Sequence, residues 1–428
     1  MLPLTTRVVV IGAGPAGLSA ALALKERGFR DVTVLEKEAG VGGKCHGIEV
    51  EGKVFDLGAN LTTPRYVNVR ALAQRLGMTL RKVPERRIVT LGTEQFESLA
   101  DANLLERLVV RGGASLYARM RHLTGIDRHG YARLRDGVEQ PFSTWLTRHG
   151  LGMFAELFEV LFVAYGYGEM GDLPAAYALK FFDRIHIQAS VDTVLGKEVP
   201  FSMDFAEGFQ ELWERVDREF DIDTKREAAV HAVNRSPRGV EVDYTHDGAR
   251  RTERFDKLIL ACPLQDTPAF LDTSPTEDRL FRQIRTQEYF VTLARLSAVP
   301  DVSTYVYPYA RRFTPGQPTV FYPPGEPDAD GMFVFYAYGG PGVDREGVRA
   351  NLTTAVRDLG GRVDQIVHTQ RWRYFPHVSS AAMLGGFYDD LEALQGEFHT
   401  FYTGELLSFT LVELIHNYSR NLVDRHFA

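Results

Sequence analysis

The sequence predicts an α/β fold with three parts: a discontinuous domain around a parallel sheet, a mixed-sheet domain and a helical cap. Three observations predict it. A short β-branched run near the N-terminus leads into a glycine-rich turn and then a helix. Apolar residues recur at helical spacing between residues 98 and 200. Two aromatic runs, at 305–309 and 332–338, have strand composition and are separated by turn residues.

The first fifty residues contain the most specific pattern. The run Val8–Ile11 is typical of a buried parallel strand, and the turn Gly12–Gly17 follows it directly. A helix of small residues comes next and ends near Gly28. A second strand, Val32–Leu35, ends at Glu36. This order of strand, glycine turn, helix, strand and acid predicts a Rossmann-type dinucleotide-binding domain.

Each residue of this pattern has a physical reason. Gly12 makes the tight turn, Gly14 lets a pyrophosphate approach the backbone, and Gly17 lets the helix pack closely on the strand. The helix N-terminus offers N–H groups and the positive end of its dipole to the phosphates. Glu36 can accept hydrogen bonds from ribose hydroxyls, and its charge disfavours a 2′-phosphate, which argues against NADP.

A second stretch, Gly166–Gly171, has the same glycine spacing. It is followed by Asp172-Leu173-Pro174, and no acid closes a second strand at the required distance. We therefore do not expect it to bind a dinucleotide.

Several segments resemble the flavin-containing amine oxidase superfamily. Gly42-Gly43-Lys44 begins six residues after Glu36, and Val54–Ala59 follows it. Three later segments match the superfamily in order: Ala206–Phe209, Asp256–Pro263 and Phe401–Glu405. The resemblance implies non-covalently bound FAD. Because the chain has no second intact dinucleotide fold, we expect no separate NAD(P)H domain.

The resemblance also implies which residues contact FAD, mostly at turns and strand ends. These residues are Gly12, Gly14, Pro15, Ala16, Gly17, Glu36, Lys37, Gly43, Lys44, Cys45, Gly58, Ala59, Ala229, Val230, Pro263, Gly404, Glu405 and Phe409.

We expect the three domains to be interleaved along the chain. Their bounds are 1–80, 205–265 and 396–428 for the FAD-binding domain, 98–200 for the helical cap, and 81–97 with 270–395 for the mixed-sheet substrate domain. Within the cap, Gly112-Gly113 predicts a break between two helices. In the substrate domain, residues 345–359 predict an amphipathic helix.

Five motifs resemble, more closely, the bacterial FAD-dependent polyunsaturated fatty acid double-bond isomerases of that superfamily. They are Gly42–His46, Tyr165–Gly168, Pro174–Lys180, Tyr374–Ser380 and Phe401–Phe409. The resemblance implies a redox-neutral reaction. A hydride leaves the methylene between two cis double bonds for flavin N5 and returns at another carbon, which gives a conjugated diene such as conjugated linoleic acid.

The same resemblance implies a substrate site for a linoleate-like fatty acid. We assign Arg87, within Glu85–Ile88, to the carboxylate, and Tyr165 and Phe375 to an aromatic slot for the tail. The family also has an aromatic gate residue, which has no clear counterpart after Lys180. The implied chemistry needs no metal, and the sequence has no His/Cys spacing of a metal site.

Two other functions remain open. One is a flavin-dependent oxidase or dehydrogenase that acts on an amine or another apolar substrate. Amine oxidases of the superfamily typically have a lysine in the substrate domain, and none of the nine lysines lies in 258–428. The other is a flavin-binding module without catalysis, such as a sensor or an assembly subunit.

Composition limits the partners and the compartment. The chain of 428 residues has a net charge of −7, so we expect no nucleic acid partner. Two single cysteines and no transmembrane-length apolar run favour a cytoplasmic protein. Residues 101–150 contain eight Arg, no Lys and five acids. This basic stretch is either a solvated helix face or a surface that contacts anionic membrane lipid.

Overall fold

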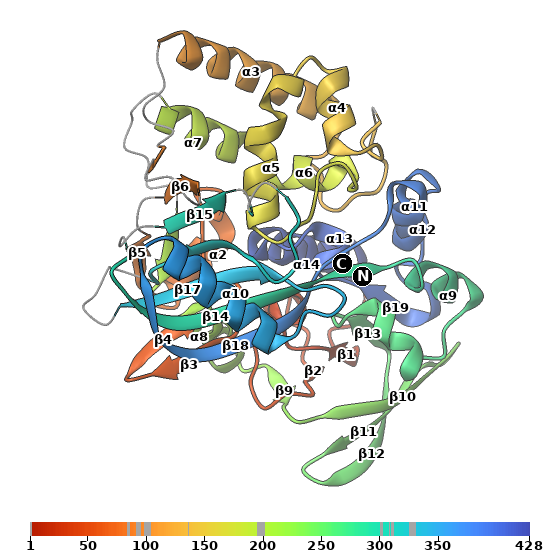
Figure 1. The fold of residues 1–428 in the computed structure, drawn as a ribbon. Helices are drawn as coiled ribbons and strands as arrows, with labels where there is room; N and C mark the ends of the chain where they lie inside the picture. The colour runs from red at the N-terminus through yellow and green to blue at the C-terminus, as the bar shows by residue number, and fades with distance from the viewer. Residues whose placement is uncertain are drawn as a thin grey trace.

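The computed structural model describes residues 2–83, 86–90, 96–97, 104–135, 137–194, 202–299, 303–307, 309, 312–324 and 331–428. The chain forms a parallel sheet and a mixed sheet, and a group of helices stands above both (Figure 1). The two termini lie close together beside the parallel sheet.

The parallel sheet has the strand order β19-β13-β1-β2-β9, and each neighbouring pair is parallel. Its strands are β1 (Val8–Ile11), β2 (Val32–Leu35), β9 (Asp223–Lys225), β13 (Lys257–Leu260) and β19 (Thr400–Tyr402). They come from three distant stretches of the chain. The predicted Rossmann-type sheet is confirmed.

Both faces of this sheet are covered, which explains why its central strands β1, β2 and β13 are largely apolar and buried. On one face, α1 (Pro15–Glu26), α8 (Phe209–Glu219) and α14 (Val412–His426) form a core with Val8 and Val10. On the other face lies an antiparallel sheet that the sequence analysis did not anticipate. Its strands are β10 (Ala229–Ser236), β11 (Gly239–His246) and β12 (Ala249–Phe255).

The mixed sheet has the order β18-β14-β17-β16-β15-β6-β7. Its strands are β6 (Arg86–Thr90), β7 (Phe96–Glu97), β14 (Arg285–Ser297), β15 (Ser303–Tyr307), β16 (Pro318–Tyr322), β17 (Met332–Tyr338) and β18 (Arg362–His377). The predicted strands at 305–309 and 332–338 correspond to β15 and β17. Helix α10 (Arg345–Asp358), also predicted, packs Leu352 and Val356 against this sheet.

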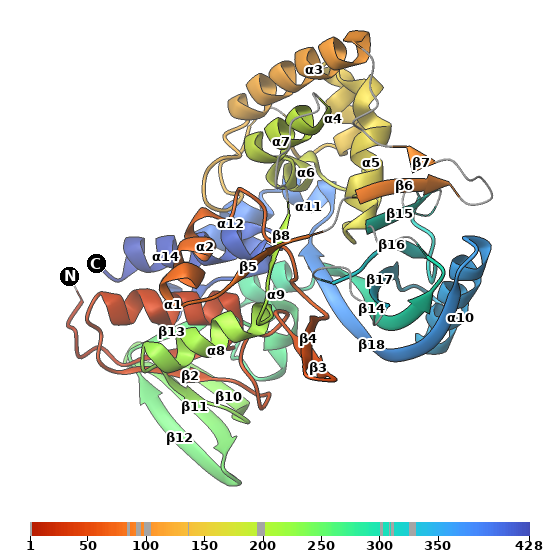
Figure 2. The ribbon, with the colours of Figure 1, turned by 90° about the vertical axis from the view of Figure 1, so that its left-hand side faces the viewer.

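The helices above the two sheets are α3 (Leu104–Leu123), α4 (Phe142–Arg148), α5 (Ala155–Ala164), α6 (Ala175–Phe181) and α7 (Arg184–Val194) (Figure 2). A single turn of 3-10 helix, η2 (Gly152–Phe154), precedes α5. The predicted break at Gly112-Gly113 is wrong, because α3 runs through both glycines. A Cβ on Gly113 would lie 2.2 Å from the ring of Phe154, so this glycine lets the ring pack on the helix. Tertiary packing outweighs low helix propensity here.

The remaining elements connect these layers. They are β3 (Gly47–Val50), β4 (Lys53–Asp56), α2 (Val67–Arg75), β5 (Leu80–Lys82), β8 (Met203–Phe205), η3 (Leu264–Ala269), α9 (Pro275–Phe281), α11 (Ser380–Leu384), α12 (Phe387–Ala393), η4 (Glu397–His399) and α13 (Glu405–Ser408). Strand β5 pairs with β8, whereas β6 joins the mixed sheet, so the chain leaves the β3–β4 region through a separate two-stranded sheet.

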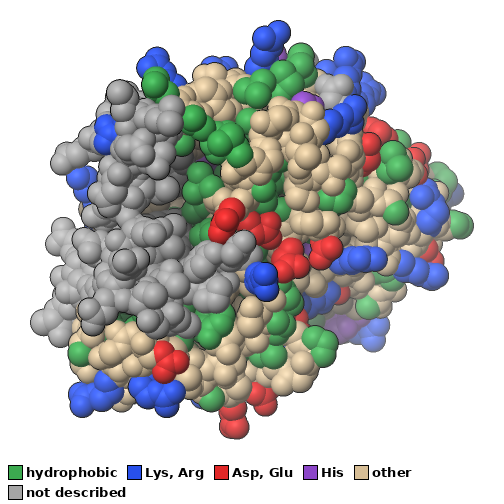
Figure 3. Space-filling model, turned by 45° about the horizontal axis from the view of Figure 1, so that its top comes forward, with side chains coloured by type: hydrophobic (Ala, Val, Ile, Leu, Met, Phe, Trp, Pro, Cys, Tyr) green, Lys and Arg blue, Asp and Glu red, His purple; other side chains and the backbone are tan. Residues whose placement is uncertain are grey.

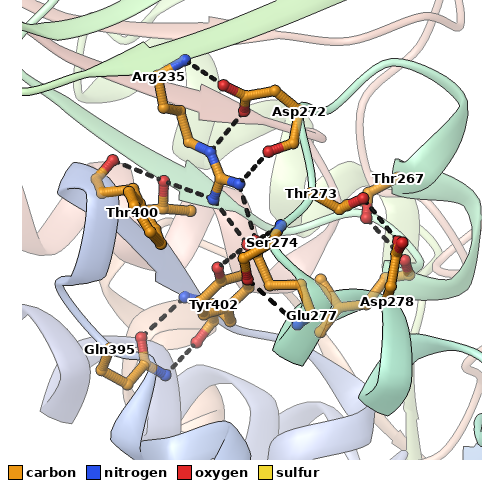
Figure 4. A network of polar contacts seen from close by, with 12 residues as sticks. Arg235, Thr267, Asp272, Thr273, Ser274, Glu277, Asp278, Gln395, Thr400 and Tyr402 are labelled. Atoms are coloured by element: carbon orange, nitrogen blue, oxygen red, sulfur yellow. Dashed lines mark hydrogen bonds and ion pairs between the residues drawn. The ribbon is translucent and has the colours of Figure 1, made fainter.

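A buried ionic network fastens three of these elements together (Figure 4). Arg235 on β10 donates hydrogen bonds to both carboxylate oxygens of Glu277 on α9, at 2.6 and 2.8 Å. It donates three more to Asp272, each at 2.7 Å, from its backbone N–H and its guanidinium. Tyr402 on β19 also donates to Glu277. The side chains of Arg235 and Glu277 are 2% and 0% exposed. The network therefore ties the parallel sheet to the start of the mixed-sheet part of the chain.

Candidate functional site

The carboxyl ends of the parallel strands meet at one edge of the sheet. Gly12 follows β1, Glu36 follows β2, Ala261 follows β13 and Thr403 follows β19. Backbone hydrogen bonds continue across this edge, from Gly12 N to the Leu35 carbonyl at 2.9 Å and from Thr403 N to the Leu260 carbonyl at 3.0 Å. In open α/β sheets, ligands bind outside this edge.

Two glycines of the first turn are required because backbone atoms of the protein lie too close to them for a side chain. Gly12 has a φ of +105°, and a Cβ on it would lie 3.0 Å from the Ala261 carbonyl oxygen. A Cβ on Gly17 would lie 1.9 Å from the Gly12 oxygen. Gly14 differs, because a Cβ there would meet only the Cα of Gly43, at 3.8 Å. A Cβ on Gly43 would in turn lie 3.1 Å from the Gly14 Cα, so the two backbones approach each other closely. Without side chains at these positions, the backbone of the turn stays accessible to a pyrophosphate.

The N-terminus of α1 points at the glycine turn that follows β1. Gly14 is the N-cap residue and Pro15 the first helical residue, and glycine has no side chain that could cap the helix. Among the described residues, no side-chain acceptor is recorded for the N–H groups of Ala16 and Gly17, and the positive end of the helix dipole faces the turn. These residues fit the phosphates of a dinucleotide.

Glu36 is held in place by the backbone around it. Its Oε2 accepts from Ala13 N at 2.7 Å and its Oε1 from Glu38 N at 2.9 Å, and the residue is 7% exposed. Each carboxylate oxygen keeps a further lone pair, which ribose hydroxyls could use. The N–H of Ala228 donates to the Glu36 carbonyl at 2.7 Å, which brings the next residues, Ala229 and Val230, beside this acid.

Lys37 is exposed, and its ammonium lies 3.6 Å from the Glu38 carboxylate. The assignment of Lys37 to the cofactor remains a prediction.

The glycine pair after Glu36 connects to the far end of the chain. Lys44 Nζ lies 2.9 Å from the Glu405 carboxylate, and both side chains are partly buried. A Cβ on Gly58 would lie 1.8 Å from the Lys44 oxygen, and Ala59 N donates to that oxygen at 2.9 Å. Gly404 lies beside Ala16, since a Cβ on Gly404 would be 4.0 Å from the Cβ of Ala16. The structure therefore brings the predicted cofactor residues from three parts of the chain into one cradle.

The two cysteines are poor nucleophiles in this structure. Burial raises the pKa of Cys45 well above its ordinary value, and it raises the pKa of Cys262 to about 12. Both thiols therefore stay protonated at neutral pH. Pro263 follows Cys262 and is the N-cap residue of η3, at the end of β13.

Aromatic rings gather beside the Phe409 end of this cradle. This aromatic cluster consists of Tyr165, Tyr167, Phe181, Tyr374, Phe375 and Phe409. The ring centroid of Tyr167 lies 5.1 Å from Phe375 and 4.9 Å from Phe409. Phe375 lies 5.6 Å from Phe409, and Tyr165 joins through Phe181 at 5.3 Å. The predicted slot residues Tyr165 and Phe375 thus belong to one cluster with a predicted cofactor residue.

Phe375 has an unusual backbone. Its φ is +47°, which is strained for a bulky side chain, and the residue is 1% exposed. His377 stacks on its ring at 4.9 Å and bonds the Phe375 carbonyl through Nδ1 at 2.8 Å. Burial lowers the pKa of His377, so the imidazole is neutral at pH 7. The neutral ring supports the position of Phe375 and brings no charge into the cluster.

Sequence reasoning did not assign Tyr167, Phe181 or Tyr374 to the site. The signal for Tyr167 was the Tyr165–Gly168 motif, in which Gly166 has a φ of +86° and packs against the ring of Tyr289. This second glycine-rich stretch follows helix α5 rather than a strand. This setting differs from the strand–turn–helix order of a dinucleotide turn, as the sequence analysis expected.

The segment after Lys180 is held by buried charges. The Arg65 guanidinium lies 3.1 Å from the Asp183 carboxylate, and His186 Nδ1 lies 3.1 Å from the same group. Burial opposes ionisation of Asp183, but the hydrogen bond from His186 and the charge of Arg65 outweigh it and hold the pKa at about 2. His186 also stacks on Phe181 of the aromatic cluster, at 5.4 Å. This ion pair occupies the segment where the resemblance implies a gate.

Arg87 lies on β6, where it is the register partner of Thr304 on β15. Its side chain lies outside the described residues, so its role remains a prediction. Among the described residues, no group of three or more His, Cys, Asp or Glu is arranged to hold a metal ion.

A family model described as "Flavin containing amine oxidoreductase" matches residues 15–371. Among curated proteins, the 1-hydroxycarotenoid 3,4-desaturase of Flavobacterium sp. (strain P99-3) is 51% identical over 57 residues, 13% of this chain. The matched stretch spans 12% of that desaturase, so the two proteins share only a short segment.

Solved structures match the whole chain. The CLA-producing fatty acid isomerase from P. acnes superposes with a TM-score of 0.90 and 26% sequence identity, and the alignment covers 100% of both chains. A putrescine oxidase superposes with a TM-score of 0.73 at 15% identity over 98% of each chain, a likeness that concerns the fold alone.

Proposed function

The chain belongs to the flavin-containing amine oxidoreductase family, and we propose that it uses non-covalently bound FAD to shift a double bond of a polyunsaturated fatty acid, which yields a conjugated diene. The observation that carries this proposal is the end-to-end structural similarity to a fatty acid isomerase. The matched family supports a flavin cofactor, and the cradle at the edge of the parallel sheet has the features that such a cofactor needs.

In this proposal, the turn Gly12–Gly17 and the N-terminus of α1 bind the pyrophosphate. Glu36 accepts hydrogen bonds from the adenosine ribose, and Glu405, oriented by Lys44, accepts them from the ribityl chain. When bound, FAD supplies a hydride acceptor and donor, which is the redox chemistry that the double-bond shift requires.

The aromatic cluster provides the surroundings for the reacting carbons. Its rings exclude water, and their faces stabilise the positive charge that develops on the diene carbons when a hydride leaves. Phe375 is held by the neutral imidazole of His377, so no second cation competes for these faces. We assign Tyr165 and Phe375 to the slot for the tail and Arg87 to the carboxylate of the fatty acid.

A flavin-dependent dehydrogenase of the desaturase kind is the second candidate. The 51% identity to a carotenoid desaturase over a short stretch favours it. Both candidates remove a hydride from an apolar chain, but only the isomerase returns it to the product. The absence of lysine from 258–428 makes amine oxidation the weaker reading of the family match.

The deciding experiment is anaerobic incubation of the flavin-loaded protein with linoleic acid, followed by ultraviolet and visible absorbance. We expect a growing conjugated-diene band, no lasting bleaching of the flavin and no requirement for NAD(P)H. A bleached flavin without a diene band would replace the isomerase by the dehydrogenase. If neither signal changes, the fatty acid proposal is wrong for this substrate class, and an aerobic peroxide screen of amines tests the remaining candidate.

A further inference from the structure

Helix α3 presents large apolar side chains to solvent. Leu108, Leu116 and Leu123 are 59%, 37% and 56% exposed. They are separated by eight and seven residues, close to two helical turns each, so they lie on one side of the helix. A helix that is buried only on its other side normally carries polar residues at such positions.

From Arg107 to Leu123, the charged side chains of α3 are all basic. Between Arg107 and Leu123 the helix contains four arginines and no Asp or Glu. Arg121 points inward, where it is almost completely buried and pairs with Asp127. Arg111 and Arg119 lie on the exposed part of the helix, among the three leucines. The outer face of α3 is therefore apolar and positively charged, within a chain whose net charge is −7.

Exposed apolar residues are also concentrated around this helix. Of the eleven large apolar side chains that are exposed among the described residues, six belong to 104–194, about a fifth of the chain. These six are Leu108, Val109, Leu116, Leu123, Met153 and Ile185. Figure 3 shows Lys and Arg side chains alternating with hydrophobic ones along the upper part of this face, where α3 lies.

We propose that the outer face of α3 docks on an anionic lipid surface. An apolar stripe flanked by arginines, on a helix with no acid from Arg107 to Leu123, is the pattern of helices that lie in the plane of a membrane interface. The leucines would enter the boundary between headgroups and acyl chains, and Arg111 and Arg119 would contact anionic headgroups. Charge complementarity selects this occupant, because a neutral protein partner would not require an acid-free face.

Vesicle co-sedimentation of the flavin-loaded protein tests the docking surface without any turnover. The two probes are vesicles of phosphatidylcholine alone and vesicles of phosphatidylcholine with phosphatidylglycerol at 3:1. Each is tested at low salt and at 0.5 M NaCl, where a Debye length of roughly 3–5 Å screens the attraction between charges. We expect binding only to the anionic vesicles at low salt. Each basic residue near the surface increases the affinity for anionic vesicles by about fivefold. R111E/R119E should therefore weaken vesicle binding by roughly 30-fold or more.

Two further variants separate charge from apolar contact. L108S/L116S keeps the charge of α3 and should also weaken vesicle binding. R251E/R345E changes the net charge by the same amount as R111E/R119E at exposed positions on β12 and α10, and should bind like the wild type. Equal binding of all variants, or equal binding to neutral vesicles, would overturn the proposal. A wild-type dimer that L108S/L116S makes monomeric would assign the face to a second copy of the chain instead.

Discussion

Gly14 and Gly17 lie in the same turn, yet a side chain has different consequences at the two positions. At Gly17 a Cβ would overlap the Gly12 carbonyl oxygen at 1.9 Å, so substitution there damages the protein itself. At Gly14 the nearest atom is 3.8 Å away, which is ordinary contact. Substitution of Gly14 can therefore remove the cofactor and leave the fold intact.

We expect Gly14→Val to fold but to lose its flavin, because the side chain occupies the space assigned to the pyrophosphate. Visible absorbance of the purified protein measures flavin content, and circular dichroism checks the fold. Gly112→Ala is the matched control, since no atom lies within 4 Å of a Cβ there. A folded, yellow Gly14→Val protein would disprove the placement of the cofactor.

Arg87 is predicted to set the register of the fatty acid. Slipping the tail by two carbons costs only about 1.6 kcal/mol of apolar burial, which changes the binding constant by roughly fifteenfold. A charged hydrogen bond to the carboxylate adds about 1.5–3 kcal/mol and fixes the position. Arg87→Ala should therefore broaden the distribution of diene isomers more than it weakens tail binding. Gas chromatography of the products measures this, with Arg86→Ala as the neighbouring control; unchanged product ratios would remove Arg87 from the site.

At the scale of elements, the Arg235 network fastens β10, α9 and β19 to one another. Arg235→Met leaves Glu277 buried without its cation, which typically costs about 3–5 kcal/mol. We expect a loss of that size in the free energy of unfolding from urea titrations. Adding Glu277→Gln should restore much of it, because the stranded charge is removed. If Arg235→Met alone is as stable as the wild type, β10, α9 and β19 hold together without the ion pair.

Helices α1 and α14 are joined by a pH-sensitive contact. His416 Nδ1 lies 2.8 Å from the Ser19 hydroxyl, and burial followed by the charge of Arg420 lowers the pKa of His416 to about 3. The folded state thus holds the neutral ring, whereas the unfolded chain takes up a proton near pH 6.5. The contribution of His416 is complete above pH 6.5 and is lost progressively as the pH falls toward 3.

Between pH 8 and pH 5 this linkage should lower the free energy of unfolding by about 2 kcal/mol. His416→Gln keeps a hydrogen-bonding side chain without the titration, so the difference between the two proteins should shrink as the pH falls. Urea unfolding at pH 8, 6.5 and 5 measures it. Parallel pH profiles for the wild type and the variant would show that His416 titrates normally in the folded state.

At the scale of the whole molecule, the cofactor cradle is built from distant segments. A ligand that contacts all of them binds the folded state and not the unfolded chain, so its removal should destabilise the protein. With FAD at 100 times its dissociation constant, the expected difference is about 2.7 kcal/mol. Thermal unfolding of deflavinated and refilled protein checks this. Gly14→Val should match the deflavinated protein and should not respond to added FAD.

No described helix is long and apolar enough to cross a membrane. The vesicle experiment and the diene experiment can fail independently.

The local part of the site could be predicted because close contacts there lie near one another in sequence. The turn Gly12–Gly17 and the acid Glu36 form one strand–helix–strand unit, and the strands β15 and β17 are distinct β-rich runs. The prediction of a helix break at Gly112-Gly113 was wrong for the opposite reason, because the decisive contact is distant in sequence. Propensity describes an isolated helix, whereas the ring of Phe154, 41 residues further along the chain, fills the space that Gly113 leaves.

The sequence by itself determined the Rossmann-type unit and the β-rich runs of the mixed sheet, because these depend on periodicity and short-range sterics. The assignments of a flavin and of an apolar tail came from the resemblance to a family, and they remain predictions. Only the tertiary structure decided that Lys44 meets Glu405, that Tyr167 joins Phe375 and Phe409, and that Arg65 neutralises Asp183. Contacts between segments hundreds of residues apart are set by how whole layers pack, and no local pattern records that packing.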